Sequence, residues 1–346
     1  MKQAERYPIT SGRIRWLDVM KCLGIFAIYL GHLGPSVGYS YDFVFSHHVA
    51  LFFFASGCAE ALSTENRNAA VYLKKRVRTI LIPYFVFGII SIAVYELSCN
   101  AAPQWIRLQF LYLMEGSVRN TFCAGGLWFF TCLFAVQVMF VIFHKFCPKW
   151  MLLAVSLGMC CISQILADPL NSPQYPYNID SACYFFFYYV LGYLLFPLMR
   201  KILGNLHRYR IQTAAATIFC IAYALLLFFQ NGTLLKLFYR PGIEILAFPV
   251  QPLPIIWLYI LGSWMLQDIR LFNHIGQDTL YLCCSEYFVS TGVSSVLGLL
   301  GLSIDITVPL AAYLYSALLV YLADRFFVPA EKRILCKVEQ YTKAIF

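Results

Sequence analysis

Long runs of apolar residues, separated by short polar connections, recur along the whole chain. Each run approaches the ~20 residues that an α-helix needs to cross the hydrocarbon core of a bilayer. We expect ten spans, at residues 16–33, 43–62, 79–98, 127–143, 150–167, 182–199, 211–230, 243–266, 278–300 and 306–324. No linker or low-complexity tract separates them. The pattern predicts an all-α, polytopic transmembrane helix bundle in which residues 1–346 form a single integral-membrane domain.

Composition and charge agree with this interpretation. The chain is 60% hydrophobic and only 12% charged, which excludes an ordinary soluble domain. Of the 26 Lys and Arg residues, 21 fall before the first span, after the tenth span or in connections on the same side of the bundle. Four fall in connections on the other side, and Lys21 lies within the first span. The side rich in Lys and Arg is normally cytoplasmic. We therefore expect a multi-pass protein of the cell membrane with both termini in the cytoplasm. Its net charge of +9 requires no nucleic-acid partner.

The first span carries ionisable residues at a helical spacing. Lys21 and His32 are eleven residues apart. At about 100° and ~1.5 Å per residue, they share one helix face and lie roughly 16 Å apart along the axis. Asp18 is positioned to pair with Lys21 at i,i+3. Ionisable groups within a membrane span are costly and are functional candidates by default. The alternative is a lysine that extends to the membrane surface and a histidine at the interface.

The start of the second span contains two further histidines, His47 and His48. Because the connection from the first span is short, we expect one of them to lie near His32. The alternative is a polar loop without a function.

The approach to the third span is strongly basic, with Lys74, Lys75, Arg76 and Arg78 within five positions. Such a cluster suits a cytosolic polyanion such as the phosphates of a nucleotide. The alternative is the positive charge that topology alone requires. No Cys-x-x-Cys pair or mixed Cys/His spacing indicates a zinc site, so we predict no metal ligands.

Several of these motifs together resemble the acyltransferase-3 family of integral-membrane acyltransferases. The resemblance follows the chain in order, through Lys21 and His32, His48 to Gly57, Lys75 to Tyr84, Gly126 to Phe129, Tyr184 to Tyr193, and Ile275 to Tyr281. We expect no appended hydrolase-like domain, and on that expectation the chain is similar to the stand-alone, fucose-O-acetylase-like branch. Glu286 stands near a place where many members have a histidine.

The resemblance implies a membrane O-acyltransferase that moves an acyl group, usually acetyl, from cytosolic acyl-CoA to a carbohydrate hydroxyl. His32, Lys21 and His48 would be the catalytic residues, with His32 as general base. Lys75, Arg76 and Arg78 would hold the CoA phosphates. Acyl-CoA is then a substrate, and no cofactor is permanently bound. The other partners are a carbohydrate or lipid-linked glycan acceptor and the lipid bilayer.

Two other functions remain open on the sequence alone. Buried charges and Pro/Gly breaks also suit a transporter or flippase of a lipid-linked saccharide. Against it, no inverted repeat is visible between residues 1–170 and 171–346. An inactive membrane scaffold is the second alternative, and the intact pair of Lys21 and His32 argues against it.

Overall fold

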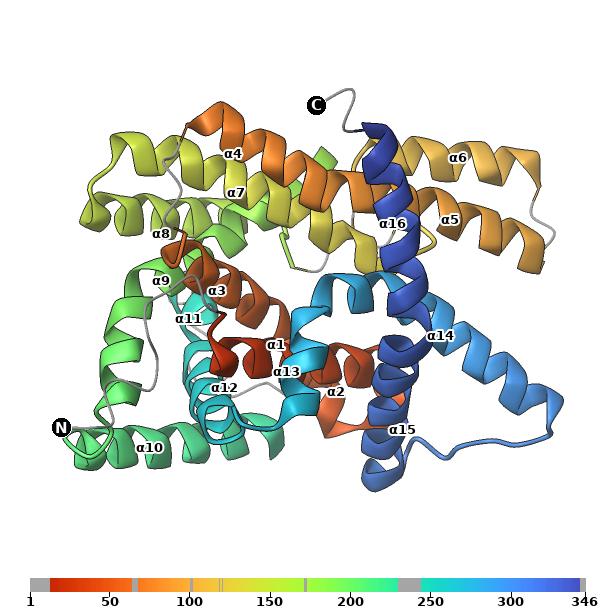
Figure 1. Cartoon of the computed structure of the whole chain (residues 1–346). Coiled ribbons are helices and arrows are strands. Elements are labelled where there is room, and N and C mark those ends of the chain that lie inside the picture. The colour runs from red at the N-terminus through yellow and green to blue at the C-terminus, as the bar shows by residue number, and fades with distance from the viewer. Residues whose placement is uncertain are drawn as a thin grey trace. The chain divides into compact units, whose positions relative to one another are not determined.

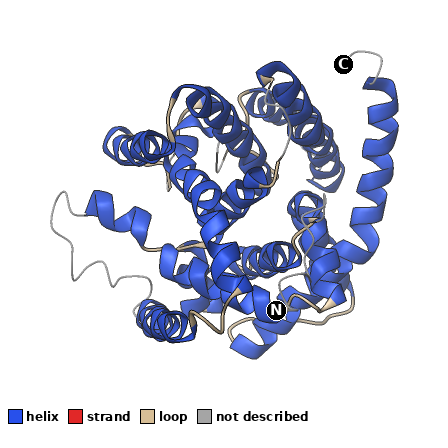
Figure 2. Ribbon diagram, turned by 60° about the vertical axis from the view of Figure 1, so that its left-hand side comes forward, coloured by secondary structure: helices blue, strands red, loops and turns tan. Residues whose placement is uncertain are grey.

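The computed structural model describes residues 13–63, 68–99, 102–117, 119, 121–170, 173–229 and 244–342. These residues form helices and connecting loops, with no strand among them (Figure 2). The all-α prediction is therefore confirmed for the described part of the chain. Figure 1 labels the helices in chain order.

Nine helical segments in the described residues are long and apolar enough to cross a membrane. They are Tyr39–Ala61, Ala69–Leu97, Gly125–Phe146, Lys149–Leu166, Pro176–Gly204, Arg210–Phe229, Glu244–Met265, Thr279–Leu299 and Pro309–Gln340. Each overlaps one of the predicted spans 2 to 10. The first predicted span is also one helix, α1 (Arg15–His32). It is not among the nine, because its 18 residues include the charged Arg15, Asp18 and Lys21.

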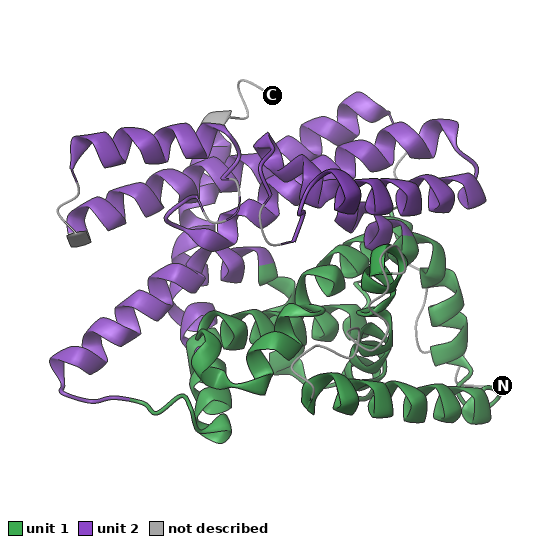
Figure 3. Ribbon diagram, turned by 180° about the vertical axis from the view of Figure 1, so that it is seen from behind, with its two compact units in different colours: residues 1–63, 191–279, 304–320 green, residues 64–190, 280–303, 321–346 purple. Residues whose placement is uncertain are grey.

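The chain divides into two compact units (Figure 3). Unit 1 comprises residues 1–63, 191–279 and 304–320, and unit 2 comprises residues 64–190, 280–303 and 321–346. The division falls within three helices, α9 (Ile179–Gly204), α14 (Thr279–Leu299) and α15 (Pro309–Leu322).

Unit 1 is built around α1. The helices that lie wholly within this unit are α1, α2 (Tyr39–Phe45), α3 (His48–Ala61), α10 (Arg210–Phe229), α11 (Glu244–Val250), α12 (Leu253–Met265) and α13 (Arg270–Gln277). Helix α1 packs against α2, α3, α12 and α13. Its C-terminal end joins a buried apolar cluster of Ala27, Leu30, Val37, Val44 and Ala312. Neighbours on so many sides place Asp18 and much of Lys21 inside unit 1.

Unit 2 centres on α7 (Trp128–Phe146), which contacts α8 (Lys149–Leu166), α4 (Ala69–Arg76) and the π-helical turn η3 (Val77–Leu81). The turn continues into α5 (Ile82–Cys99), which packs on α6 (Pro103–Met114). A second π turn, η7 (Ala323–Phe327), leads into α16 (Val328–Thr342). At the end of η3 the N–H of Ile82 donates to the carbonyl of Val77, five residues earlier. Pro83 follows directly and cannot donate, which disturbs the ordinary helical ladder at this point.

Candidate functional site

The charged residues of α1 form an ion pair inside unit 1. Lys21 Nζ lies 2.7 Å from Asp18 Oδ1, and the two side chains are 26% and 7% exposed. Asp18 is buried because α13 passes over its backbone. A Cβ placed on Gly276 would lie 1.8 Å from the Asp18 carbonyl oxygen, so only glycine permits this approach. The predicted i,i+3 pair is therefore present, and it lies where α1 and α13 cross.

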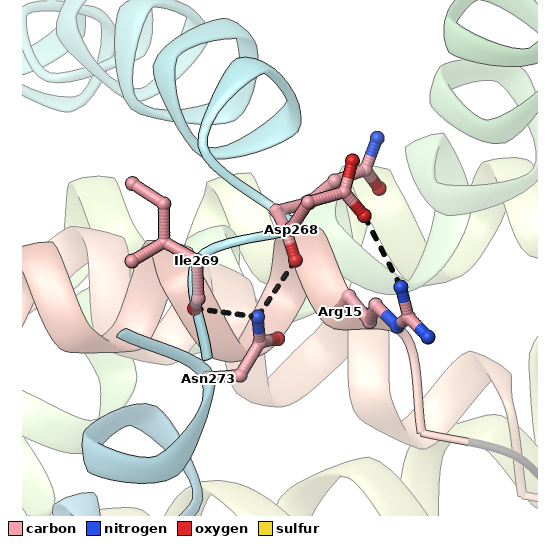
Figure 4. A network of polar contacts seen from close by, with 5 residues as sticks. Arg15, Asp268, Ile269 and Asn273 are labelled. Atoms are coloured by element: carbon pink, nitrogen blue, oxygen red, sulfur yellow. Dashed lines mark hydrogen bonds and ion pairs between the residues drawn. The ribbon is translucent and has the colours of Figure 1, made fainter. Parts of the chain in front are cut away.

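The turn that leads from α12 into α13 is held by polar contacts (Figure 4). Arg15 donates to the carboxylate of Asp268 at 3.1 Å, and both side chains are exposed. The amide of Asn273 donates to the carbonyls of Gln267 at 2.7 Å and Ile269 at 3.0 Å. These bonds fix the start of α13, and with it the position of Gly276 against Asp18.

The C-terminal end of α1 carries His32, which is exposed. The preceding Gly31 lies against α2, because a Cβ at that position would be 3.1 Å from side-chain atoms of both Val44 and Phe45. Lys21 and His32 thus lie on one uninterrupted helix, as their spacing requires. The side chain of Lys21 is mostly buried, whereas that of His32 is exposed.

His48 begins α3 and is buried beside this end of α1. Its Nδ1 lies 2.7 Å from the Val44 carbonyl oxygen, and its ring packs edge-on against Phe45 at 5.0 Å. A carbonyl can only accept, so the Nδ1 of His48 carries the proton in the neutral imidazole. The basic lone pair is then on Nε2. Val44 and Phe45, the residues that contact Gly31, therefore also set the orientation of His48.

His47 has a different environment, which the sequence did not indicate. Its Nδ1 donates to the Phe43 carbonyl at 2.8 Å, and its Nε2 accepts from the Tyr259 hydroxyl at 3.2 Å. Both nitrogens are engaged, so His47 ties α2 to α12. The predicted catalytic role of His48 stays a prediction. Tyr259 had no signal in the sequence, because a tyrosine within an apolar span is usually structural.

The predicted cations lie in unit 2. Lys75 is exposed, Arg76 lies over the Tyr72 ring at 4.6 Å, and Arg78 stands in the π turn η3. Arg78 Nη2 pairs with Glu339 Oε2 of α16 at 3.0 Å. This partner, 261 positions away, could not be predicted from the sequence.

The structure therefore brings some predicted site residues together. Lys21 and His32 share α1, and contacts of Gly31 with α2 place His48 near the same end of that helix. Lys75, Arg76 and Arg78 form a separate group. Glu286, which stands near the family's later histidine, is half-buried in α14.

Comparison with protein families gives one match. The family described as an acyltransferase domain, acyltransferase-3, matches residues 14–325. The chain belongs to this family. No curated protein and no solved structure matches it. The match includes all six predicted site residues and identifies a membrane acyltransferase, as the motifs had indicated.

Two glycines in the motifs of this acyltransferase have a clear physical purpose. Gly276 allows the backbone of Asp18 to pack closely against α13, as described above. Gly192 of α9 lies against α3, where an added Cβ would be 2.0 Å from the Phe54 carbonyl oxygen. The carbonyl of Gly192 also accepts from the Cys58 thiol at 3.5 Å. Both motifs thus contribute close backbone packing around the helices that carry the candidate residues.

Proposed function

We propose that this acyltransferase transfers an acyl group, acetyl by preference, from cytosolic acyl-CoA to a hydroxyl of a carbohydrate or lipid-linked glycan. The observation that carries the proposal is the pair of imidazoles at one end of α1. His32 follows a glycine that packs on Val44 and Phe45, and the same two residues orient His48.

The residues suggest a direct chemical scheme. His32 accepts the proton of the acceptor hydroxyl while the hydroxyl oxygen attacks the thioester carbonyl. The carbon–sulfur bond breaks, and the CoA thiolate leaves and is protonated. His48 has a fixed tautomer and orients His32 or the acceptor. Lys21, held by Asp18, maintains positive charge on the same face of α1.

Lys75, Arg76 and Arg78 are proposed to bind the CoA phosphates. Guanidinium groups form paired, charge-assisted hydrogen bonds with phosphate, which supports this assignment. Arg78 would have to leave or share its bond with Glu339 to take part. The acyl-CoA would bind from the cytoplasm, with both termini on that side and the bundle in the cell membrane. A place in the fucose-O-acetylase-like branch is part of the same proposal.

The test is acyl transfer from labelled acetyl-CoA in native membranes that contain equal amounts of each variant. We expect His32→Ala to lower the rate by about 10²–10⁴-fold, the usual value of a general base. His48→Ala should have an intermediate effect. His207 is an exposed histidine elsewhere on the chain, and His207→Ala is the matched control. Near-normal transfer by the His32→Ala protein would overturn the mechanism and favour a transporter.

A single substitution is a poor test of Lys21, because it would leave the Asp18 carboxylate buried and unpaired. Breaking a buried ion pair on one side typically costs about 3–5 kcal/mol of stability, whereas replacing both partners can be almost neutral. The double variant Asp18→Asn/Lys21→Gln removes both charges and nearly preserves shape. We expect it to remain folded and to lose turnover. A folded double variant with full activity would reduce Lys21 to a structural role.

A further inference from the structure

Arg119 occupies an unusual position in unit 2, in the segment between α6 and α7. Its guanidinium lies over the Trp128 ring, with its central carbon 4.0 Å from a ring centroid. It donates one hydrogen bond from Nη1 to the Leu170 carbonyl. The backbone N–H of Arg119 donates to the Asn178 side-chain oxygen at 3.1 Å. Two separate parts of the chain therefore hold this side chain, and a third holds its backbone.

The surroundings of Arg119 are rigid. The fully buried Asn178 also donates to the Gly116 carbonyl at 3.1 Å and to the Thr131 hydroxyl at 3.0 Å. Ser117 and Asn178 adopt positive φ angles of 48° and 52°, which are uncommon for residues other than glycine. Such conformations persist where the surrounding structure determines them. The guanidinium is consequently held in place before any ligand arrives.

The charge of Arg119 is incompletely balanced by the protein. A guanidinium has five N–H donors, and in the described residues only one of them has a protein acceptor. Among those residues it also forms no ion pair with a carboxylate. Burial lowers the pKa of Arg119 to about 10, while the negative charge of the exposed Asp168 acts in the opposite direction. The group is still a cation at neutral pH.

We propose that Arg119, supported by the face of Trp128, binds an oxyanion, either a carboxylate or a phosphate. Stacking on the ring leaves the edge of the guanidinium for a paired hydrogen bond with two oxygens, a geometry that lysine cannot reproduce. The anion would offset the cost of holding a partly buried cation. This anion site goes beyond the proposed function and lies wholly within unit 2. The anion belongs either to an acidic sugar or to the phosphate of a lipid-linked saccharide.

The first experiment uses the unaltered protein in detergent, without acyl-CoA. Phenylglyoxal modifies accessible arginines, and mass spectrometry measures modification at Arg119 and at the exposed Arg107 of α6. Glucuronate, inorganic phosphate and a detergent-dispersed polyprenyl phosphate serve as probes, with glucose as the neutral control. We expect at least one anion to protect Arg119 but not Arg107. Absence of selective protection by all three anions would overturn the proposal.

The second experiment compares the affinity of the protecting anion for variants that elute as folded monodisperse protein. Arg119→Gln should bind about 10- to 100-fold more weakly, the usual effect of losing a hydrogen bond to a charged group. Arg119→Lys should recover only part of this loss, and Arg107→Gln should match the unaltered protein. Equal affinity in Arg119→Gln would refute the inference. Stronger binding of glucuronate indicates an acidic sugar, and stronger binding of the polyprenyl phosphate indicates the lipid-linked source.

These measurements do not depend on catalysis. If anion binding fails while His32→Ala still abolishes transfer, the proposed function stands and the anion site is wrong. If anion binding succeeds while His32→Ala retains activity, Arg119 is a binding residue and the catalytic mechanism is wrong.

Discussion

The close approach of Gly276 to Asp18 allows us to predict how much stability Gly276→Ala should lose. The new Cβ would lie 1.8 Å from the Asp18 carbonyl oxygen, and ordinary contact begins at 3.4 Å. Helices α13 and α1 would have to separate by about 1.6 Å, since neither backbone can rotate away like a side chain. Overpacking typically costs about 1–3 kcal/mol. We expect a cost near the upper end of that range because the obstacle is main chain.

The same displacement of α1 should also lower the rate of acyl transfer. Helix α1 carries Lys21 and His32, and a misplacement of about 1 Å can cost roughly 10²-fold in rate. Gly276→Ala should therefore lower both the unfolding temperature and acyl transfer. Unfolding can be followed in detergent by tryptophan fluorescence, with Trp16 of α1, which stacks on Phe196 at 6.1 Å, as one reporter within unit 1. Transfer is measured from labelled acetyl-CoA.

The matched control is Gly262→Ala on α12. No atom outside its own helix segment lies within 4 Å of a Cβ at that position. Alanine is the better helix former by about 1 kcal/mol, so this variant should be as stable as the unaltered protein or slightly more stable. If Gly276→Ala matched the control in unfolding temperature and activity, the close crossing of α1 and α13 would be wrong.

The ion pair in unit 2 and the orientation of the chain give two further predictions. If Arg78 binds CoA phosphates, Glu339→Gln should raise acyl-CoA affinity a few-fold by releasing it, and Arg78→Glu should lower affinity in a salt-sensitive way. Neither should change stability by more than about 1 kcal/mol, since both partners are partly exposed. Unchanged affinity in both variants would exclude Arg78 from the donor site. Reporter fusions at Asn171 and Phe346 should lie on opposite sides of the membrane, and a shared side would contradict the ten-span topology.

Local features of the fold were predictable because they depend on neighbouring residues. Apolar runs of sufficient length define the long helices that could span a membrane in the described residues. The turn angle of a helix alone places Lys21 and His32 on one face, and the i,i+3 spacing predicts the ion pair of Asp18 with Lys21. Each of these features is set within a few helical turns.

Features that depend on distant contacts were not predictable. Gly276 meets Asp18 and Gly192 meets Phe54 across large separations in sequence, and a glycine in an apolar run gives no indication of its partner. The pairing of Arg78 with Glu339 was hidden for the same reason. Membrane topology alone explains a positive residue near the end of a span. The sequence around such a residue therefore does not indicate which distant residue it pairs with.

The two adjacent histidines show how backbone geometry separates residues that look equivalent in a sequence. Consecutive side chains at the start of a helix point about 100° apart, so His47 and His48 cannot face the same neighbours. Both donate from Nδ1 to a carbonyl four residues earlier, which leaves the lone pair on Nε2 in each. The lone pair of His47 accepts from Tyr259. Protonating it would break that bond and oppose a role as base. His48 instead packs against Phe45, beside the glycine that precedes His32. The tautomer alone does not distinguish the two histidines, but the hydrogen bond from Tyr259 argues against His47 as the base.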